Sequence, residues 1–111
     1  MPAAYIKDEA EFDQLLAEEA LFVVDCTAAW CGPCRLVAPL IDQLADEYSD
    51  RAKVLKLDLD DNKAIAKRYG IRSIPAVMVF KQGECLETIV GKKPYEDYSA
   101  AIEKHASSAT A

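Results

Sequence analysis

Residues 30–34 read Trp30-Cys31-Gly32-Pro33-Cys34. Two residues separate the two thiols, and this spacing can close a small disulfide at the start of a helix. An apolar run at residues 21–24 precedes the motif, and a helical pattern of apolar residues begins near Cys34. We therefore expect the thiol pair in a turn between a strand and a helix. Because the same cysteine spacing also occurs in zinc sites, the motif alone leaves redox and metal-binding functions open.

The composition around this motif is that of a soluble globular protein. The chain has 111 residues, of which 51% are hydrophobic and 29% are charged. A domain of this size buries about two thirds of its unfolded surface, so it needs no disulfide for stability. No apolar run approaches the ~18 residues that a membrane span requires. We expect one domain over residues 1–111 and no contact with a membrane.

The charge argues against nucleic acid as a partner. Thirteen Lys and Arg against nineteen Asp and Glu give a net charge of -6, and the basic residues are scattered, so a phosphate backbone would be repelled. Residues 1–7 contain neither a basic cluster followed by an apolar core nor an Arg-rich stretch. We expect a cytoplasmic protein, or one of an organelle stroma if a transit peptide was removed.

Periodicity and turn signals predict strands and helices in alternation. The helices are expected at 8–20, 34–48, 62–69 and 95–105, and the strands at 21–26, 53–58, 76–80 and 85–90. Alternation implies a parallel core, whereas the turn at 81–84 joins the last two strands as an antiparallel hairpin. The sequence therefore predicts an α/β fold with a central mixed sheet, helices on both faces, and a frayed tail over about 107–111.

Three side chains of this region suggest thiol chemistry. Cys31 would lie at a helix N-terminus, where unpaired amides and the helix dipole stabilise a thiolate, which makes it the candidate nucleophile. Cys34, one turn inside the helix, would be shielded and would act as the resolving thiol. Asp25 ends an apolar run, so burial would raise its pKa and allow proton exchange near neutrality. An exposed strand end is the alternative for Asp25.

Three separated motifs resemble the thioredoxin family along nearly the whole chain. They are Trp30–Cys34 after a strand that ends in Asp25, Gly70-Ile71-Arg72-Ser73-Ile74-Pro75 before another apolar strand, and Val90-Gly91 after the hairpin. The resemblance implies a thioredoxin fold and a monomer that reduces disulfides in target proteins by dithiol-disulfide exchange. It also implies a redox-active Cys31-Cys34 disulfide, no bound cofactor or metal, and electrons from an NADPH- or ferredoxin-dependent thioredoxin reductase.

The resemblance also implies roles for individual residues. Asp25 would take the proton of Cys34, and Lys56 would lie beside Asp25 and lower its pKa, although a solvated surface lysine is the alternative for Lys56. The family has a cis bond before the proline that matches Pro75. Targets would lie as an added strand on a rim made of Trp30, Gly32, Pro33, Ile74, Pro75, Val90 and Gly91. For Trp30, an apolar cover over the site competes with a core aromatic residue.

The chain departs from the family at Cys26-Thr27, where many members have Phe-Trp. Cys26, Cys31, Cys34 and the distant Cys85 also fit the spacing of a plant-type two-iron cluster, which would be a binding function. Against this alternative, Cys26 belongs to a predicted strand and Cys34 to a helix. In the family arrangement the strand at 76–80 separates Cys26 from Cys85, so no disulfide is expected between them. A docking domain without catalysis is a third alternative, and the retained Cys31, Cys34, Asp25 and Pro75 argue against it.

Overall fold

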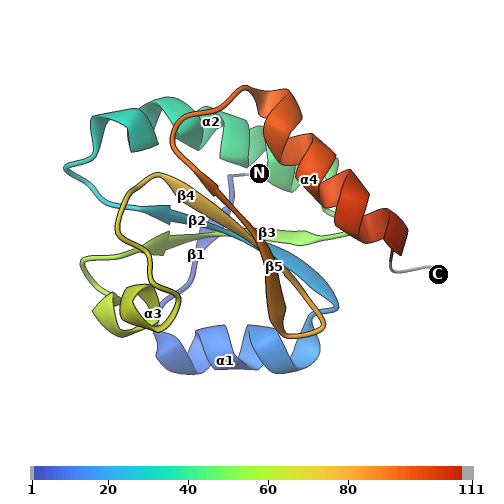
Figure 1. Ribbon diagram of the computed structural model, residues 1–111, viewed down its shortest axis with the longest axis horizontal. Helices are drawn as coiled ribbons and strands as arrows, with labels where there is room; N and C mark the ends of the chain where they lie inside the picture. Colours follow the sequence, from blue (N-terminus) through green and yellow to red (C-terminus); the bar gives the residue numbers. More distant parts are fainter. Residues whose placement is uncertain (1, 109–111) are drawn as a thin grey trace.

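The computed structural model describes residues 2–108, which form a five-stranded sheet covered by helices on both faces (Figure 1). The strands are β1 (Ala4–Tyr5), β2 (Leu21–Thr27), β3 (Lys53–Asp58), β4 (Ala76–Lys81) and β5 (Glu84–Val90). The helices are α1 (Glu9–Glu18), α2 (Gly32–Glu47), α3 (Lys63–Arg68) and α4 (Tyr95–Ser108). Helices α2 and α4 cover one face of the sheet, and α1 and α3 cover the other.

The sheet has the strand order β1-β3-β2-β4-β5. Strands β1 and β2 both pair with β3 in parallel, whereas β4 is antiparallel to β2 and to β5. The predicted mixed sheet is therefore confirmed, and so is the antiparallel hairpin, whose turn holds Gln82 and Gly83 at positive φ. Because β2 lies in the centre and is buried on both faces, its apolar run is continuous rather than alternating.

Two apolar cores lie on opposite faces of the sheet. On the α2 and α4 face, side chains such as Val23, Ile41 and Tyr98 pack together. On the other face Phe12 contacts three aromatic rings edge to face, with centroid distances of 6.3 Å to Phe22, 5.7 Å to Tyr69 and 5.6 Å to Phe80. These two cores fix the sheet between its helices, and they hold the strand ends that carry the polar residues of the site.

The helix ends follow local capping chemistry. Asp8 caps α1 by accepting a hydrogen bond from the amide of Glu11 at 2.9 Å. Helix α2 begins at Gly32 rather than at Cys34, because Cys31 caps it. Helix α4 extends to Ser108, past its predicted end at residue 105 and into the predicted frayed tail. Residues 109–111, the rest of that predicted tail, lie outside the described residues.

The two-residue strand β1 is absent from the sequence-based prediction, because a stretch this short carries no alternation of apolar and polar residues. Among residues 2–108, none of the helices has the length and apolar character needed to cross a lipid bilayer.

Candidate active site

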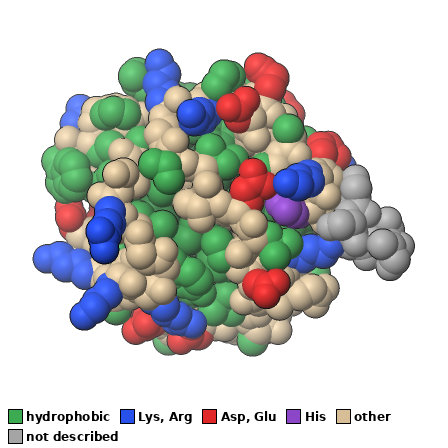
Figure 2. Space-filling model, in the orientation of Figure 1, with side chains coloured by type: hydrophobic (Ala, Val, Ile, Leu, Met, Phe, Trp, Pro, Cys, Tyr) green, Lys and Arg blue, Asp and Glu red, His purple; other side chains and the backbone are tan. Residues whose placement is uncertain are grey.

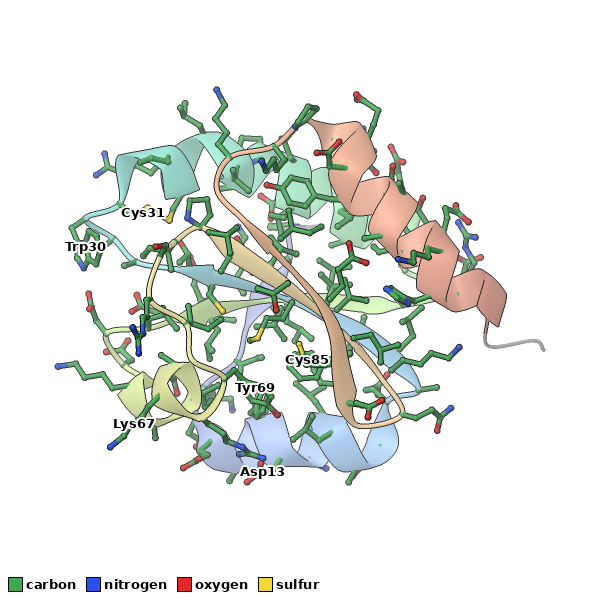
Figure 3. All side chains as sticks on the ribbon, viewed as in Figure 1. Asp13, Trp30, Cys31, Lys67, Tyr69 and Cys85 are labelled. Carbon is green, nitrogen blue, oxygen red and sulfur yellow. A yellow bond between two sulfur atoms is a disulfide. The ribbon has the colours of Figure 1, made fainter. Side chains whose placement is uncertain are left out.

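The thiol pair lies at the N-terminus of α2, directly after the loop that follows β2 (Figure 3). Cys31 and Cys34 form a disulfide with 5.3 Å between their Cα atoms, and both residues are buried. The Cys31 sulfur caps the helix by accepting a hydrogen bond from the amide of Cys34 at 3.2 Å. The predicted strand-to-helix turn is confirmed, and the helix end places the amide donor of Cys34 at the Cys31 sulfur.

A second segment reaches the disulfide from the loop before β4. The Ile74-Pro75 peptide bond is cis, and the carbonyl oxygen of Ile74 lies 3.9 Å from the Cys31 sulfur. Ile74 packs against the small apolar cluster that the two cysteines form with Ala28. The amide of Gly91 donates to the carbonyl of Pro75 at 2.8 Å, which ties the end of the hairpin to the same loop. The fold thus brings together three motifs that are far apart in the sequence.

Trp30 lies at the edge of the molecule beside Cys31 (Figure 3). Its side chain is 68% exposed, and its indole N–H donates to Asp60 at 2.9 Å. The alternative of a core aromatic residue is therefore wrong. Gly32, Pro33 and Val90 are exposed as well. Figure 2 shows hydrophobic side chains at the surface where α2 begins, bordered by Lys and Arg.

Asp25 is 1% exposed, so the alternative of a solvated strand end is wrong. Burial raises its pKa from the ordinary value of 3.8 to about 7, against the lowering effect of the Lys56 cation and with a smaller raising effect of Asp42. Its Oδ1 atom has no hydrogen-bond partner among the protein atoms that the structure describes. A buried carboxyl group of this kind can take up and release a proton near neutral pH.

Lys56 is buried, which rules out a solvated surface lysine. It pairs with Asp25 in the register of β2 and β3, and its ammonium forms a salt bridge with Asp42 at 3.0 Å. Asp42 was missed by sequence reasoning. The only signal for it is a single acid next to the apolar residue Ile41 in α2, and nothing in that pattern identifies a partner on β3.

The two remaining cysteines are free thiols. Cys26 is buried in β2, and burial together with the Asp25 charge raises its pKa to about 12. Cys85 is half-buried in β5, with its sulfur 3.6 Å from the hydroxyl of Thr88. Strand β4 separates β2 from β5, as expected from the family arrangement. Within residues 2–108, no group of three or more His, Cys, Asp or Glu side chains could hold a metal ion.

Comparison with known proteins extends the likeness over nearly the whole chain. The thioredoxin family model matches residues 3–104. Thioredoxin 1 of Synechococcus elongatus is 44% identical over 106 residues, which cover 95% of this chain and 99% of that protein. Chloroplastic thioredoxin M5 of Oryza sativa is 45% identical over 104 residues, which are 93% of this chain and 60% of that protein. The crystal structure of Malassezia sympodialis thioredoxin has a TM-score of 0.87 at 33% identity, covering 96% of this chain and 95% of that one.

A disulfide held at a helix end on this sheet, together with such relatives, defines a thiol-disulfide oxidoreductase. The chain belongs to the thioredoxin family, and it is a protein-disulfide reductase. The predicted thioredoxin fold is confirmed. Its partners are proteins with disulfides and a reductase, and the reaction needs no cofactor because the redox pair consists of the chain's own thiols.

Proposed function

We propose that Cys31 is the nucleophile and Cys34 the resolving thiol of this reductase. The observation that carries the assignment is the capping hydrogen bond, in which the Cys31 sulfur accepts the amide of Cys34 at 3.2 Å. In the reduced protein the same amide and the positive end of the helix would stabilise a Cys31 thiolate. Cys34 lies within the first turn of α2 and Cys31 at its cap position, and both are nearly buried, at 2% and 4% exposure. The order of attack is therefore assigned from the position of Cys31 at the helix end rather than from exposure.

The proposed reaction has two displacement steps. The Cys31 thiolate attacks one sulfur of a target disulfide, which forms a mixed disulfide and releases the other target sulfur as a thiolate. Cys34 then loses its proton and attacks the Cys31 sulfur. This step releases the second target thiol and forms the Cys31-Cys34 bond. The target gains two electrons and two protons, and the thiol pair of the reductase is oxidised.

We also propose that Asp25 accepts the proton of Cys34 in the second step, with Lys56 as its neighbouring cation. Two features support this role. Asp25 is buried on the sheet face that α2 covers, and its pKa of about 7 allows it to be ionised before the step and protonated after it. Lys56 lowers that pKa, so that Asp25 is not protonated throughout the physiological range.

The proposed target surface is the rim expected from the sequence, which consists of Trp30, Gly32, Pro33, Ile74, Pro75, Val90 and Gly91. Its support is the exposure of Trp30 at 68% and Val90 at 50%, next to a loop whose Ile74 carbonyl lies beside the Cys31 sulfur. An extended target segment would pair with the backbone of Ile74 as an added strand. Backbone pairing on an apolar surface would select for accessible disulfides rather than for one sequence.

A thioredoxin reductase is the proposed electron donor, and it is either an NADPH-dependent or a ferredoxin-dependent enzyme. The relatives include cyanobacterial and chloroplastic thioredoxins, which supports a place in the cytoplasm or in an organelle stroma. Reduction of the Cys31-Cys34 disulfide by each reductase, measured in parallel, decides between the donors. We propose further that the chain acts as a monomer, which sedimentation at several protein concentrations tests.

The reduction of insulin disulfides in the presence of dithiothreitol tests the assigned roles. The wild-type protein should accelerate the precipitation of insulin chains, and Cys31→Ser should give only the background rate. Cys85→Ser is the matched control, because it removes a free thiol from β5 and should keep full activity. Equal rates for wild type and Cys31→Ser would show that Cys31 is not the nucleophile.

A further inference from the structure

One carboxylate oxygen of Asp42 interacts with two groups from separate parts of the chain. Asp42 Oδ1 accepts the backbone amide of Ala3 at 2.9 Å and forms the salt bridge with Lys56 Nζ at 3.0 Å. Asp42 therefore connects helix α2 with β3 and with the segment that enters β1. The Lys56 side chain is only 10% exposed, so its ammonium depends on protein groups rather than on water for compensation of its charge.

The same ammonium acts electrostatically on the proposed proton acceptor, Asp25. Asp25 and Lys56 are paired residues of adjacent parallel strands, so their side chains lie on the same face of the sheet. That face is covered by α2, which carries Asp42 as well as Cys34. Lys56 thus acts on two carboxyl groups: that of Asp25, which is buried in the sheet, and that of Asp42, which is partly exposed on α2. Because the positive charge of Lys56 is held by Asp42, it stabilises the ionised form of Asp25 less than it would without Asp42.

We propose that Asp42 is a positioning residue for resolution: it holds the Lys56 ammonium and competes for it, so that Asp25 keeps enough proton affinity to accept the proton of Cys34. This inference rests on the role proposed above for Asp25. Helix α2 would then carry both Cys34, which loses the proton, and Asp42, which adjusts the proton affinity of the acceptor Asp25. Asp42 touches no reacting atom; its own charge has a smaller raising effect on the pKa of Asp25, and the proposed positioning role acts through Lys56.

The other titratable groups near Asp25 do not interfere in the neutral range. From α4, Tyr98 feels the Asp25 charge, and burial raises the pKa of Tyr98 above its ordinary value of 10. Cys26, the next residue in β2, has a pKa of about 12. The pKa of Asp42 itself is lowered, because hydrogen bonds from Ala3 and Lys56 outweigh the raising effect of burial. Asp25, with a pKa of about 7, therefore titrates in a range where Asp42 stays ionised.

The direct test is the titration of the Asp25 carboxyl carbon by NMR in the oxidised protein, where Cys31 and Cys34 do not titrate. Asp42→Asn removes a negative charge and leaves Lys56 to Asp25, so the Asp25 midpoint should fall by about half a pH unit or more. An unchanged or higher midpoint overturns the proposal. Glu47→Gln is the matched control: it removes a charge from the same helix and a 2.7 Å hydrogen bond to Tyr95, and it should leave the midpoint unchanged.

A double-mutant cycle tests whether Asp42 acts through Lys56. Lys56→Gln should raise the Asp25 midpoint, and in that background Asp42→Asn should produce less than half of its original shift. A shift that stays undiminished overturns the positioning role, because Asp42 would then act on Asp25 directly. If Asp42→Asn does not fold, Asp42→Ser provides the same measurement, since the Asp42 side chain is 36% exposed and tolerates a smaller polar residue.

The rate of mixed-disulfide resolution, measured against pH, separates this inference from the function on which it rests. Asp42→Asn should move the acid limb of the profile to lower pH by the amount that the NMR midpoint moves. An unmoved midpoint overturns the role of Asp42 and leaves that of Asp25 standing. A moved midpoint with an unmoved kinetic profile overturns the role of Asp25 in resolution.

Discussion

The sulfur atom of Cys31 lies 3.9 Å from the carbonyl oxygen of Ile74, a residue 43 positions further along the chain. One partner belongs to the start of a helix and the other to the loop that enters β4. A target sulfur that approaches Cys31 must therefore lie next to the backbone at Ile74. This proximity links the chemistry of the thiol to the surface on which a target would rest.

The division of labour between the two cysteines predicts a trapped intermediate. Cys34→Ser keeps the Cys31 thiolate but has no thiol to resolve the mixed disulfide, so targets should accumulate as covalent adducts. Non-reducing gels of the variant incubated with a disulfide-containing protein measure this. The double variant Cys31→Ser/Cys34→Ser should form no adducts. If the double variant also formed adducts, the reacting thiol would be Cys26 or Cys85 instead.

Asp25 should make stability depend on pH in a definite direction. Its pKa is raised from 3.8 to about 7 in the folded protein, so between these values the folded state binds more protons than the unfolded state. Stability must then fall as pH rises through this window. Asp25→Asn lacks this loss and should be more stable than wild type by up to about 4 kcal/mol above pH 7, with little difference near pH 4. Urea unfolding of the oxidised proteins at several pH values measures the effect, and parallel curves for the two proteins would contradict it.

The same substitution should affect the two kinetic steps unequally. Asp25→Asn removes the proposed proton acceptor of Cys34 but leaves the helix end at Cys31 intact, so resolution should slow by about 10-fold or more while the first attack changes little. Stopped-flow kinetics with a single turnover of a disulfide peptide separates the steps. Equal slowing of both would remove Asp25 from the proton transfer.

The aromatic cluster on the α1 and α3 face should carry much of the stability. Phe12 is fully buried among Phe22, Tyr69 and Phe80, so Phe12→Ala should cost about 3–5 kcal/mol of unfolding free energy through lost burial and the cavity left behind. Denaturant unfolding measures it. Leu36→Ala is the control, since Leu36 is 60% exposed and its loss should cost about 0.5 kcal/mol or less.

A charge on the rim should weaken target binding without harming the fold. Val90 is 50% exposed, and Val90→Asp would place a carboxylate where an apolar target surface must be desolvated, at a cost of about 1 kcal/mol or more. The KM for a protein disulfide should rise about fivefold or more, with the unfolding midpoint nearly unchanged. Leu86→Asp, at a residue of the same strand that is 40% exposed, should leave KM unaltered. Similar KM values for both variants would place the target surface elsewhere.

Local patterns were sufficient for much of the site. The apolar run before Asp25 predicted its burial, because a central strand leaves no solvent for an acid at its end, and the cysteine spacing predicted the turn at the start of α2. These features depend on neighbours in the sequence. Even so, α2 begins at Gly32 because a sulfur atom caps it, and the usual preference for Ser, Thr, Asp or Asn at that position gives no hint of this.

What the sequence did not predict depends on pairing across the fold. The resemblance implied Lys56 beside Asp25, but the salt bridge between Lys56 and Asp42 joins different elements and follows only from the packing of α2 on β3. The exposed position of Trp30 was expected, but the hydrogen bond of its indole N–H to Asp60, in the loop after β3, could not be read from the motif. Geometry between distant segments decided each of these cases.

Most helices are capped by an oxygen atom that takes no part in chemistry, whereas α2 is capped by the sulfur that also forms the disulfide. A thiolate carries a full charge and accepts an amide hydrogen bond at least as well as a disulfide sulfur does. We therefore expect the first turn of α2 to keep its capping hydrogen bond when the disulfide is reduced. Turnover between the two states then requires no rebuilding of the backbone at this helix end.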